Sequence, residues 1–384
     1  MKIGAGRVVP PFRVMDVARV ANERAASLPP GAPKILRMEV GQPGTGLPHG
    51  AKLAVQAALQ TGDALGYTEA LGRPSLRARI ARHMADWYGV EIPAARIAVT
   101  LGASGAFSLA FLACFEPGDQ VALAAPYYPP YVNTLTALGM RPVVLPCGIE
   151  TGFQPTIGML EALPEKPEGL ILASPANPTG SMLAPAELAA LCRYCDENGI
   201  RLISDEIYHG LTYGKPQASA AQFSASAVVV NSFSKYFSMT GWRVGWMALP
   251  EDMVRATERL AQNMFISAPH ISQIAAEAAF ACGDELEANR ATYQTARGIL
   301  TAGLREAGYS TFAPPDGAFY IYVDIGGRAE DSAAFCAQLL ASHNIAATPG
   351  LDFDAARGGH YVRFSYCAAL ADIEDAVARL KQPG

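Results

Sequence analysis

The chain has 384 residues, of which 50% are hydrophobic and 17% charged, with a formal net charge of −5. This composition excludes a disordered chain, and without a long Lys/Arg cluster we expect no binding to nucleic acid or to a membrane surface. The sequence begins without the apolar core of a secretory signal, and no apolar run is long enough to cross a bilayer, so we expect a cytoplasmic protein. Seven scattered cysteines, an odd number, are typical of reduced thiols.

Short apolar segments alternate with helical stretches through the middle of the chain. Their apolarity is continuous rather than alternating, which indicates strands that are covered on both faces. The predicted fold class is therefore α/β, with a mainly parallel sheet between helices. The predicted strands are residues 96–100, 120–124, 141–145, 169–173, 201–204, 227–230 and 244–249.

The two ends of the chain have a different pattern. Residues 1–45 carry proline-rich and helical patches, and residues 281–384 combine a long polar helix with apolar strands. We therefore expect a large α/β domain over residues 46–280 and a smaller α+β domain over 281–384, to which the arm at 1–45 contributes. The cleft between the two domains is the expected substrate site.

Polar or glycine-rich turns follow five of the predicted strands. Ligands of open α/β sheets bind outside the carboxyl ends of the strands, so these turns are expected to converge on one site. The turns are LGASGA, APYYPPY, SPANPTG, DEIYHG and NSFSK.

The last of these turns carries the most chemistry. Lys235 directly follows a buried strand, where a charged amine needs either solvent or a partner that neutralises it. Ser232 and Ser234 offer hydroxyl groups, and Arg243 offers a planar cation that suits phosphate oxygens. The glycines of GWRVG let the backbone bend closely around a ligand. Together these groups predict half of a phosphate site.

The other half of the phosphate site is predicted at Ala103 and Ser104. They begin a helix, where free backbone N–H groups attract an anion. Asn177, Asp205 and Tyr208 follow neighbouring strands. Each of the three has an ordinary interpretation as a cap or turn residue, so it is their coincidence at adjacent strand ends that favours a ligand site.

The motifs NPTG (177–180), DEIY (205–208), SFSK (232–235) and GWRVG (241–245) resemble, in this order and spacing, those of the pyridoxal-phosphate-dependent aminotransferases of class I and II. The resemblance runs over nearly the whole chain. It implies fold type I with a seven-stranded sheet, pyridoxal 5'-phosphate as cofactor, and ping-pong transfer of the amino group of an L-amino acid to a 2-oxo acid. A lyase or decarboxylase of amino acids on the same fold is the alternative.

The resemblance also implies a role for each residue of the turns. Lys235 would form a Schiff base with the cofactor aldehyde and, once released, act as general base. Asp205 would face the pyridine nitrogen, while Tyr208 and Asn177 would hydrogen-bond the phenolic oxygen. Tyr128 would stack on the cofactor ring. The residues that would hold the phosphate are Ala103, Ser104, Ser232, Ser234 and Arg243.

Three further positions take roles from the same resemblance. Tyr67 would reach the phosphate in the neighbouring subunit, which implies a homodimer with shared sites. Arg363 would clamp the substrate α-carboxylate, and the backbone of Gly41 would contact the same group. One departure is Ser267-Ala268-Pro269, where many relatives have Ser-Asn-Pro.

Side-chain specificity is not readable from the sequence. Phe12 and Val14 are candidates for the side-chain pocket, and no motif offers a second arginine for a side-chain carboxylate. Acidic, aromatic and aliphatic amino acids therefore all stay open as substrates.

Two short patterns have competing interpretations. Residues 232–235 also fit the S-x-x-K motif of penicillin-recognising acylases, but the S-D-N and K-T-G elements of those enzymes do not occur. Cys192 and Cys195 form a CxxC without a second ligand pair, so we expect core packing and no metal. A cofactor-binding transcription regulator of this fold would need an added DNA-binding domain, which the acidic sequence does not indicate.

Overall fold

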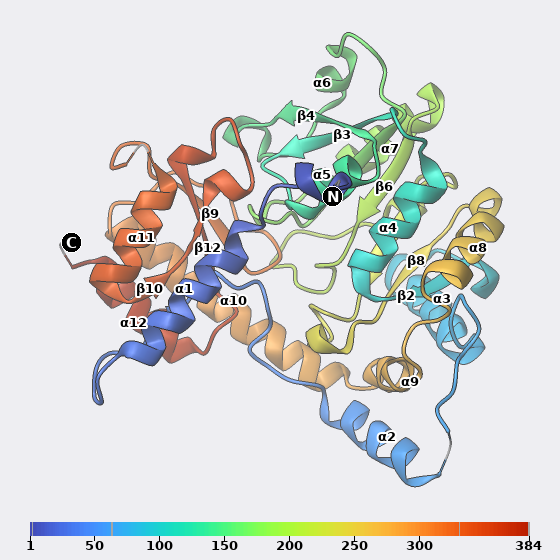
Figure 1. The fold of residues 1–384 in the computed structure, drawn as a ribbon, viewed down its shortest axis with the longest axis horizontal. Helices are drawn as coiled ribbons and strands as arrows, with labels where there is room; N and C mark the ends of the chain where they lie inside the picture. Colours follow the sequence, from blue (N-terminus) through green and yellow to red (C-terminus); the bar gives the residue numbers. More distant parts are fainter. Residues whose placement is uncertain (2, 63, 330, 383–384) are drawn as a thin grey trace.

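The centre of the computed structural model, which describes residues 1, 3–62, 64–329 and 331–382, is a seven-stranded sheet (Figure 1). The strand order is β2-β8-β7-β6-β5-β3-β4, in which β8 is antiparallel to both neighbours and the other pairs are parallel. The predicted α/β class and all seven predicted strands are confirmed. The strands are β2 (Ile97–Thr100), β3 (Gln120–Ala125), β4 (Arg141–Pro146), β5 (Gly169–Ala173), β6 (Arg201–Asp205), β7 (Val228–Ser232) and β8 (Gly245–Ala248).

Helices cover both faces of this sheet, which is why its central strands are apolar throughout. Alternate residues of β7 point to opposite faces: Val228 and Val230 pack with α4 (Gly102–Cys114), α5 (Pro130–Ala137) and α8 (Val254–Met264), whereas Val229 packs with the other layer. That other layer contains α3 (Pro74–Tyr88), α7 (Pro185–Asn198) and α9 (His270–Ala279). Cys192 and Cys195 of α7 are fully buried there as free thiols, as their core position predicts.

A second group of elements forms beside the large sheet. Its three-stranded sheet has the antiparallel order β11-β12-β9, and β1 pairs with β10 in parallel. Figure 1 shows α1, from the N-terminal part, lying against the C-terminal elements β10 and α11. The elements are α1 (Arg13–Ser27), β1 (Leu36–Arg37), α10 (Gly283–Glu306), β9 (Tyr320–Asp324), α11 (Ser332–His343), β10 (Ile345–Ala346), β11 (Thr348–Pro349), β12 (Tyr361–Ser365) and α12 (Leu370–Leu380).

Two short elements connect or extend these groups. The 3-10 helix η1 (Ala5–Val8) packs against α5, while α1 packs against β10 and β11, so residues 9–12 pass from one group to the other. Helix α2 (His49–Gln60) packs against α9 and projects from the body of the fold (Figure 1). Within the described part of the chain, no helix combines the length and apolarity that a transmembrane span requires.

Candidate active site

A cavity of about 270 Å³ lies where the strands of the large sheet end. Asp205 ends β6 and lines the cavity, and Ser234 and Lys235 follow β7 into it. On the opposite side, β9 and β12 contribute Tyr320 and Arg363. The predicted site residues that line the cavity are Gly41, Ala103, Ser104, Tyr128, Asn177, Asp205, Tyr208, Ser234, Lys235, Arg243 and Arg363.

The amine of Lys235 is held inside this cavity. Its Nζ donates a hydrogen bond of 2.6 Å to the carbonyl oxygen of Gly41 and lies 5.7 Å from the centre of the Tyr208 ring. Burial lowers the pKa of Lys235 to about 8, and the cationic Arg363 and Arg243 act in the same direction. An amine with such a pKa is partly unprotonated near neutral pH, so it can act as a nucleophile or a base.

The carboxylate of Asp205 lies at the end of β6 and is buried. It accepts hydrogen bonds from the Tyr131 hydroxyl and, at 3.1 Å, from the backbone N–H of Ile207. Burial raises the pKa of Asp205 to about 6, although these hydrogen bonds and the charge of Lys235 oppose the shift. At neutral pH the ionised form therefore prevails, but the buried charge lowers the stability of the fold. A cationic partner in the cavity would reduce this loss of stability.

The start of α4 and the side chain of Arg243 form one end of the cavity. Ala103 and Ser104 lie in the first turn of the helix, where backbone N–H groups have no partner within the helix. Gly102 has a φ of +66°, and a Cβ there would lie 2.5 Å from Nη2 of Arg243. Only glycine therefore lets the guanidinium approach the helix start this closely. The combination of a helix N-terminus, a hydroxyl and a guanidinium suits an anion.

Two predicted residues do not line the cavity. Ser232 lies behind Ser234: its hydroxyl donates to the carbonyl of Val244 at 3.1 Å and lies 2.8 Å from the Ser234 hydroxyl. From this position the Ser232 hydroxyl contacts the Ser234 side chain and does not face the cavity. Tyr67 is 83% exposed, in the loop that follows α2.

Arg363 is the buried cation at the other end of the cavity. Its Nη1 donates to Oδ1 of Asn177 at 2.8 Å, and its Nη2 donates to the Glu39 carbonyl at 2.5 Å and to the Thr348 hydroxyl at 3.2 Å. The guanidinium also stacks over the ring of Tyr320 at 4.4 Å. These contacts fix its plane before any ligand binds, which is the geometry that recognises a carboxylate.

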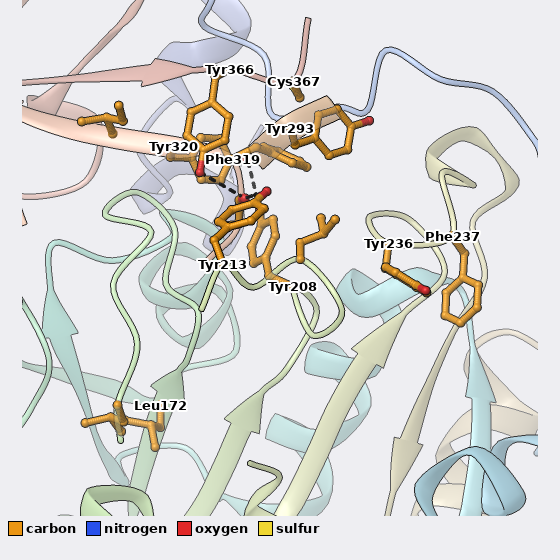
Figure 2. Packing of buried hydrophobic residues seen from close by; sticks show 14 of the residues in the cluster. Leu172, Tyr208, Tyr213, Tyr236, Phe237, Tyr293, Phe319, Tyr320, Tyr366 and Cys367 are labelled. Carbon is orange, nitrogen blue, oxygen red and sulfur yellow. Dashed lines mark hydrogen bonds between the residues drawn. The ribbon is translucent and has the colours of Figure 1, made fainter. Parts of the chain in front are cut away.

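An aromatic cluster supports the side of the cavity between these ends. Figure 2 shows Tyr208, Phe319 and Tyr320 packed together, and the hydroxyls of Tyr208 and Tyr320 are 2.9 Å apart. A Cβ at Gly41 would lie 1.9 Å from the Tyr320 hydroxyl, so the backbone that accepts from Lys235 passes directly over this ring. The cluster therefore positions the Tyr208 hydroxyl and the Lys235 amine together.

Several residues that line the cavity or support its side chains were missed by sequence reasoning. Tyr131 lies in the turn APYYPPY and Tyr320 in residues 317–325, but nothing in these segments distinguishes the two from core tyrosines. Thr348 has no motif around it and contacts Arg363 only because β11 pairs with β12. Met15 and Ala18 extend the apolar wall for which Phe12 and Val14 were candidates.

The groups around the cavity fit the parts of pyridoxal phosphate. The buried amine of Lys235 suits the aldehyde, and the carboxylate of Asp205 suits the pyridine nitrogen. The phosphate suits the start of α4 with Arg243, in the space that Gly102 leaves open. Asn177 also lines the cavity, so its amide can reach a bound molecule.

Comparisons with known proteins agree with this chemistry. Residues 33–380 match the family described as "Aminotransferase class I and II". The chain is 48% identical to the valine–pyruvate aminotransferase of Mycobacterium tuberculosis over 97% of this chain and 96% of the relative. It is 32% identical to the (5-formylfuran-3-yl)methyl phosphate transaminase of Methanocaldococcus jannaschii over 97% of this chain and 96% of that relative.

Solved structures show the same relationship. The crystal structure of an aminotransferase from Mycobacterium tuberculosis superimposes with a TM-score of 0.96 at 47% identity, covering 99% of this chain and 98% of the other. The structure of the aspartate aminotransferase of Thermus thermophilus with maleate superimposes with a TM-score of 0.92 at 29% identity, covering 99% of both chains. By sequence and by fold, the chain belongs to the class I and II aminotransferases, enzymes that depend on pyridoxal phosphate.

Proposed function

We propose that the protein transfers the amino group of an L-amino acid with an apolar side chain to a 2-oxo acid, with the cofactor bound to Lys235. The observation that carries this proposal is one cavity that brings together the Lys235 amine, the Asp205 carboxylate and the Arg363 guanidinium. Amine, carboxylate and guanidinium are the groups needed to hold the cofactor, keep its ring nitrogen protonated and bind the substrate carboxylate.

When bound, pyridoxal phosphate supplies the electron sink that allows the Cα–H bond of the substrate to break. The amine of Lys235, once released from the cofactor, takes the proton from the substrate Cα and would deliver it to the carbon of the cofactor aldehyde in the same half-reaction. Its lowered pKa favours this role because the amine needs no strong base to become neutral. Arg363 holds the substrate carboxylate in the plane fixed by Asn177 and Tyr320, so that Cα faces the lysine.

The side of the cavity formed by the N-terminal segment supports an apolar substrate. Phe12, Val14, Met15 and Ala18 are all apolar. Among the described lining residues the cations are Lys235, Arg243 and Arg363, and each serves the cofactor or the α-carboxylate in this proposal. An acidic side chain would therefore enter without a partner, which is costly. The name of the 48% identical relative, valine–pyruvate aminotransferase, agrees with an apolar donor and with pyruvate as acceptor.

We propose a homodimer in which Tyr67 reaches the phosphate of the partner site. The support is its exposure, together with exposed Leu53 and Leu59 on the projecting helix α2. The loop of Tyr67 is held by Ser267, whose hydroxyl accepts from the Thr68 N–H at 3.4 Å, so the departure at 267–269 keeps this contact. Sedimentation of the holoenzyme as a monomer would contradict the dimer.

Two further proposals concern the division of the chain into domains and its place in the cell. We propose the domain division 1–45, 46–280 and 281–384, because α1 packs on β10 and β11 of the small sheet. We also propose a cytoplasmic location, supported by seven cysteines that are all free thiols.

The attachment of the cofactor to Lys235 is tested by reduction with borohydride followed by peptide mass spectrometry. We expect the reduced cofactor on the peptide that contains Lys235, and no visible chromophore in a folded Lys235→Ala variant. Lys215→Ala, which changes the preceding lysine in the chain, is the control and should keep both signals. A wild-type protein without a lysine-bound chromophore would refute the assignment.

The reaction type is tested with a panel of amino acids and two acceptors, 2-oxoglutarate and pyruvate. Mass detection should find the new amino acid formed from the acceptor and the 2-oxo acid formed from the donor. Release of carbon dioxide, or of a product without consumption of the acceptor, would instead identify a decarboxylase or lyase.

A further inference from the structure

The helix that walls the substrate side of the cavity is capped by a residue from the other end of the chain. Helix α1 begins at Arg13, and its N-cap residue, Phe12, has no side chain that can accept a hydrogen bond. Asp352 takes that role: its Oδ1 accepts from the Arg13 N–H at 2.9 Å and its Oδ2 accepts from the Val14 N–H at 3.2 Å. A buried carboxylate at this position satisfies two free N–H groups and interacts favourably with the helix dipole.

The first two turns of α1 contain the residues of this helix that face the cavity. Val14, Met15 and Ala18 line it, and the ring of Phe12 meets the ring of Tyr128 edge-on, with centroids 6.0 Å apart. Of the two N–H groups that Asp352 binds, one belongs to Val14, a residue of the apolar wall, and the other to Arg13, which directly precedes it. Without the carboxylate, the first turn would lose its cap, and uncapped first turns fray.

The segment that carries Asp352 also contacts the carboxylate clamp. Thr348 lies directly opposite Arg363 in the β11–β12 pair, and its hydroxyl accepts from Nη2 of that arginine. Between Thr348 and Asp352, the backbone of Gly350 is packed so closely that a Cβ there would lie 2.4 Å from the Gly358 carbonyl oxygen. Residues 348–352 thus form a tightly packed connection between the group that would bind the substrate carboxylate and the wall that would meet its side chain.

We propose that Asp352 is a positioning residue for substrate specificity, which holds the first turn of α1 at a set distance from Arg363. This inference rests on the proposed function, because it assumes that an amino acid bound at Arg363 extends its side chain toward α1. Asp352 does not line the cavity, so we expect it to act by positioning the helix and not by contact with the substrate.

The kinetic test compares valine with alanine in the holoenzyme and in Asp352→Ala. Each buried methylene contributes about fourfold to binding, so the two extra carbons of valine are worth up to about 15-fold. We expect Asp352→Ala to lower the preference for valine over alanine about tenfold, through KM for valine. The value of kcat/KM for alanine should change less than about threefold because the Arg363 clamp remains. Asp352→Asn keeps one acceptor oxygen, so its preference for valine should lie between those of the wild type and Asp352→Ala.

A matched control is available in the same turn. Asp354 is also buried, but it accepts from the backbone N–H groups of residues 356 and 357 and pairs with Arg357 rather than with α1. Asp354→Asn should leave the preference for valine unchanged. An equal loss of kcat/KM for valine and alanine in Asp352→Ala would overturn the specificity role.

Hydrogen exchange of the holoenzyme gives a readout that does not depend on activity. Amides near the start of α1 should exchange at least tenfold faster in Asp352→Ala than in wild type or Asp354→Asn. Unchanged exchange would overturn the inference, and faster exchange with an unchanged substrate preference would leave Asp352 a structural cap only. A wild type that transaminates no amino acid would instead refute the proposed function, while the exchange result would still decide whether Asp352 holds the helix.

Discussion

Asp205 should make the folded, cofactor-free protein less stable as the pH rises. The carboxyl group is buried, and burial raises its pKa from 3.8 to about 6. A folded-state pKa above the unfolded value means that the folded protein binds the proton more tightly, so protonation stabilises the fold. This stabilisation is fully present below the unfolded pKa and is lost as the pH rises through about 6. Substitution by asparagine, which does not titrate, removes this dependence.

The size of the effect follows from the two pKa values. Over the whole pH range, the rise in the pKa of Asp205 from 3.8 to about 6 corresponds to about 3 kcal/mol of unfolding free energy. Between pH 5 and pH 8 the carboxyl group of Asp205 should account for about 1.4 kcal/mol, because the rest of the effect falls below pH 5, where the unfolded chain also becomes protonated. The difference in unfolding free energy between Asp205→Asn and wild type should therefore shift by about 1.4 kcal/mol in favour of the variant at pH 8.

Urea unfolding of the two cofactor-free proteins at pH 5 and pH 8, at one protein concentration, measures this difference. Because the comparison is between two proteins at each pH, other titrating groups cancel unless they interact with Asp205. Any constant cost of packing an asparagine beside Tyr131 cancels between the two pH values. A difference that is the same at both values would refute the assignment of a costly buried carboxylate.

Three further predictions test the ends of the cavity and its ligand. Gly102→Ala places a Cβ 2.5 Å from Arg243 Nη2, so absorbance titration should show a cofactor affinity at least about tenfold weaker. Gly89→Ala is the control: Gly89 has a similar φ of +65° but open space around it, so this variant should bind the cofactor as the wild type does. Arg363→Lys loses the fixed guanidinium plane over Tyr320, so KM for the amino acid should rise about tenfold or more while cofactor absorbance is unchanged; an unchanged KM would contradict its role. Removal of the cofactor should lower the midpoint of thermal unfolding, and equal midpoints would argue against binding at a folded-state site.

The parts of the fold that the sequence predicts are those whose signals are local. β7 is buried over its whole length, and a continuous run of valines suffices to identify such a strand. The turn that follows it brings hydroxyl groups, an amine and a guanidinium within a dozen residues, so their common site is also readable. The antiparallel direction of β8 was not predicted, because apolar content alone does not distinguish the direction of a strand.

The parts that could not be predicted depend on contacts between distant segments. Asp352 caps a helix that begins more than 300 residues earlier, and its own neighbourhood contains no capping signal for that helix. Thr348 contacts Arg363 only through the pairing of β11 with β12. Ser232 shows the converse: its place in the SFSK turn suggested a direct phosphate contact, but its hydroxyl is directed to Ser234 and Val244. Local sequence identifies the turn, whereas packing decides which of its hydroxyls faces the cavity.

The cavity buries more positive than negative charge, and the proposed ligands would balance this excess. The described lining residues include three cations, Lys235, Arg243 and Arg363, and one carboxylate, Asp205. An excess of buried positive charge is unfavourable in the protein alone; burial lowers the pKa of Lys235, and the charges of Arg363 and Arg243 add to that effect. A phosphate group and a substrate carboxylate would supply the missing negative charge at the two arginines, while a protonated ring nitrogen would pair with Asp205. Burial of these charges costs the folded protein free energy, and the binding of anionic ligands offsets that cost. The affinity for such ligands is therefore coupled to the stability of the fold.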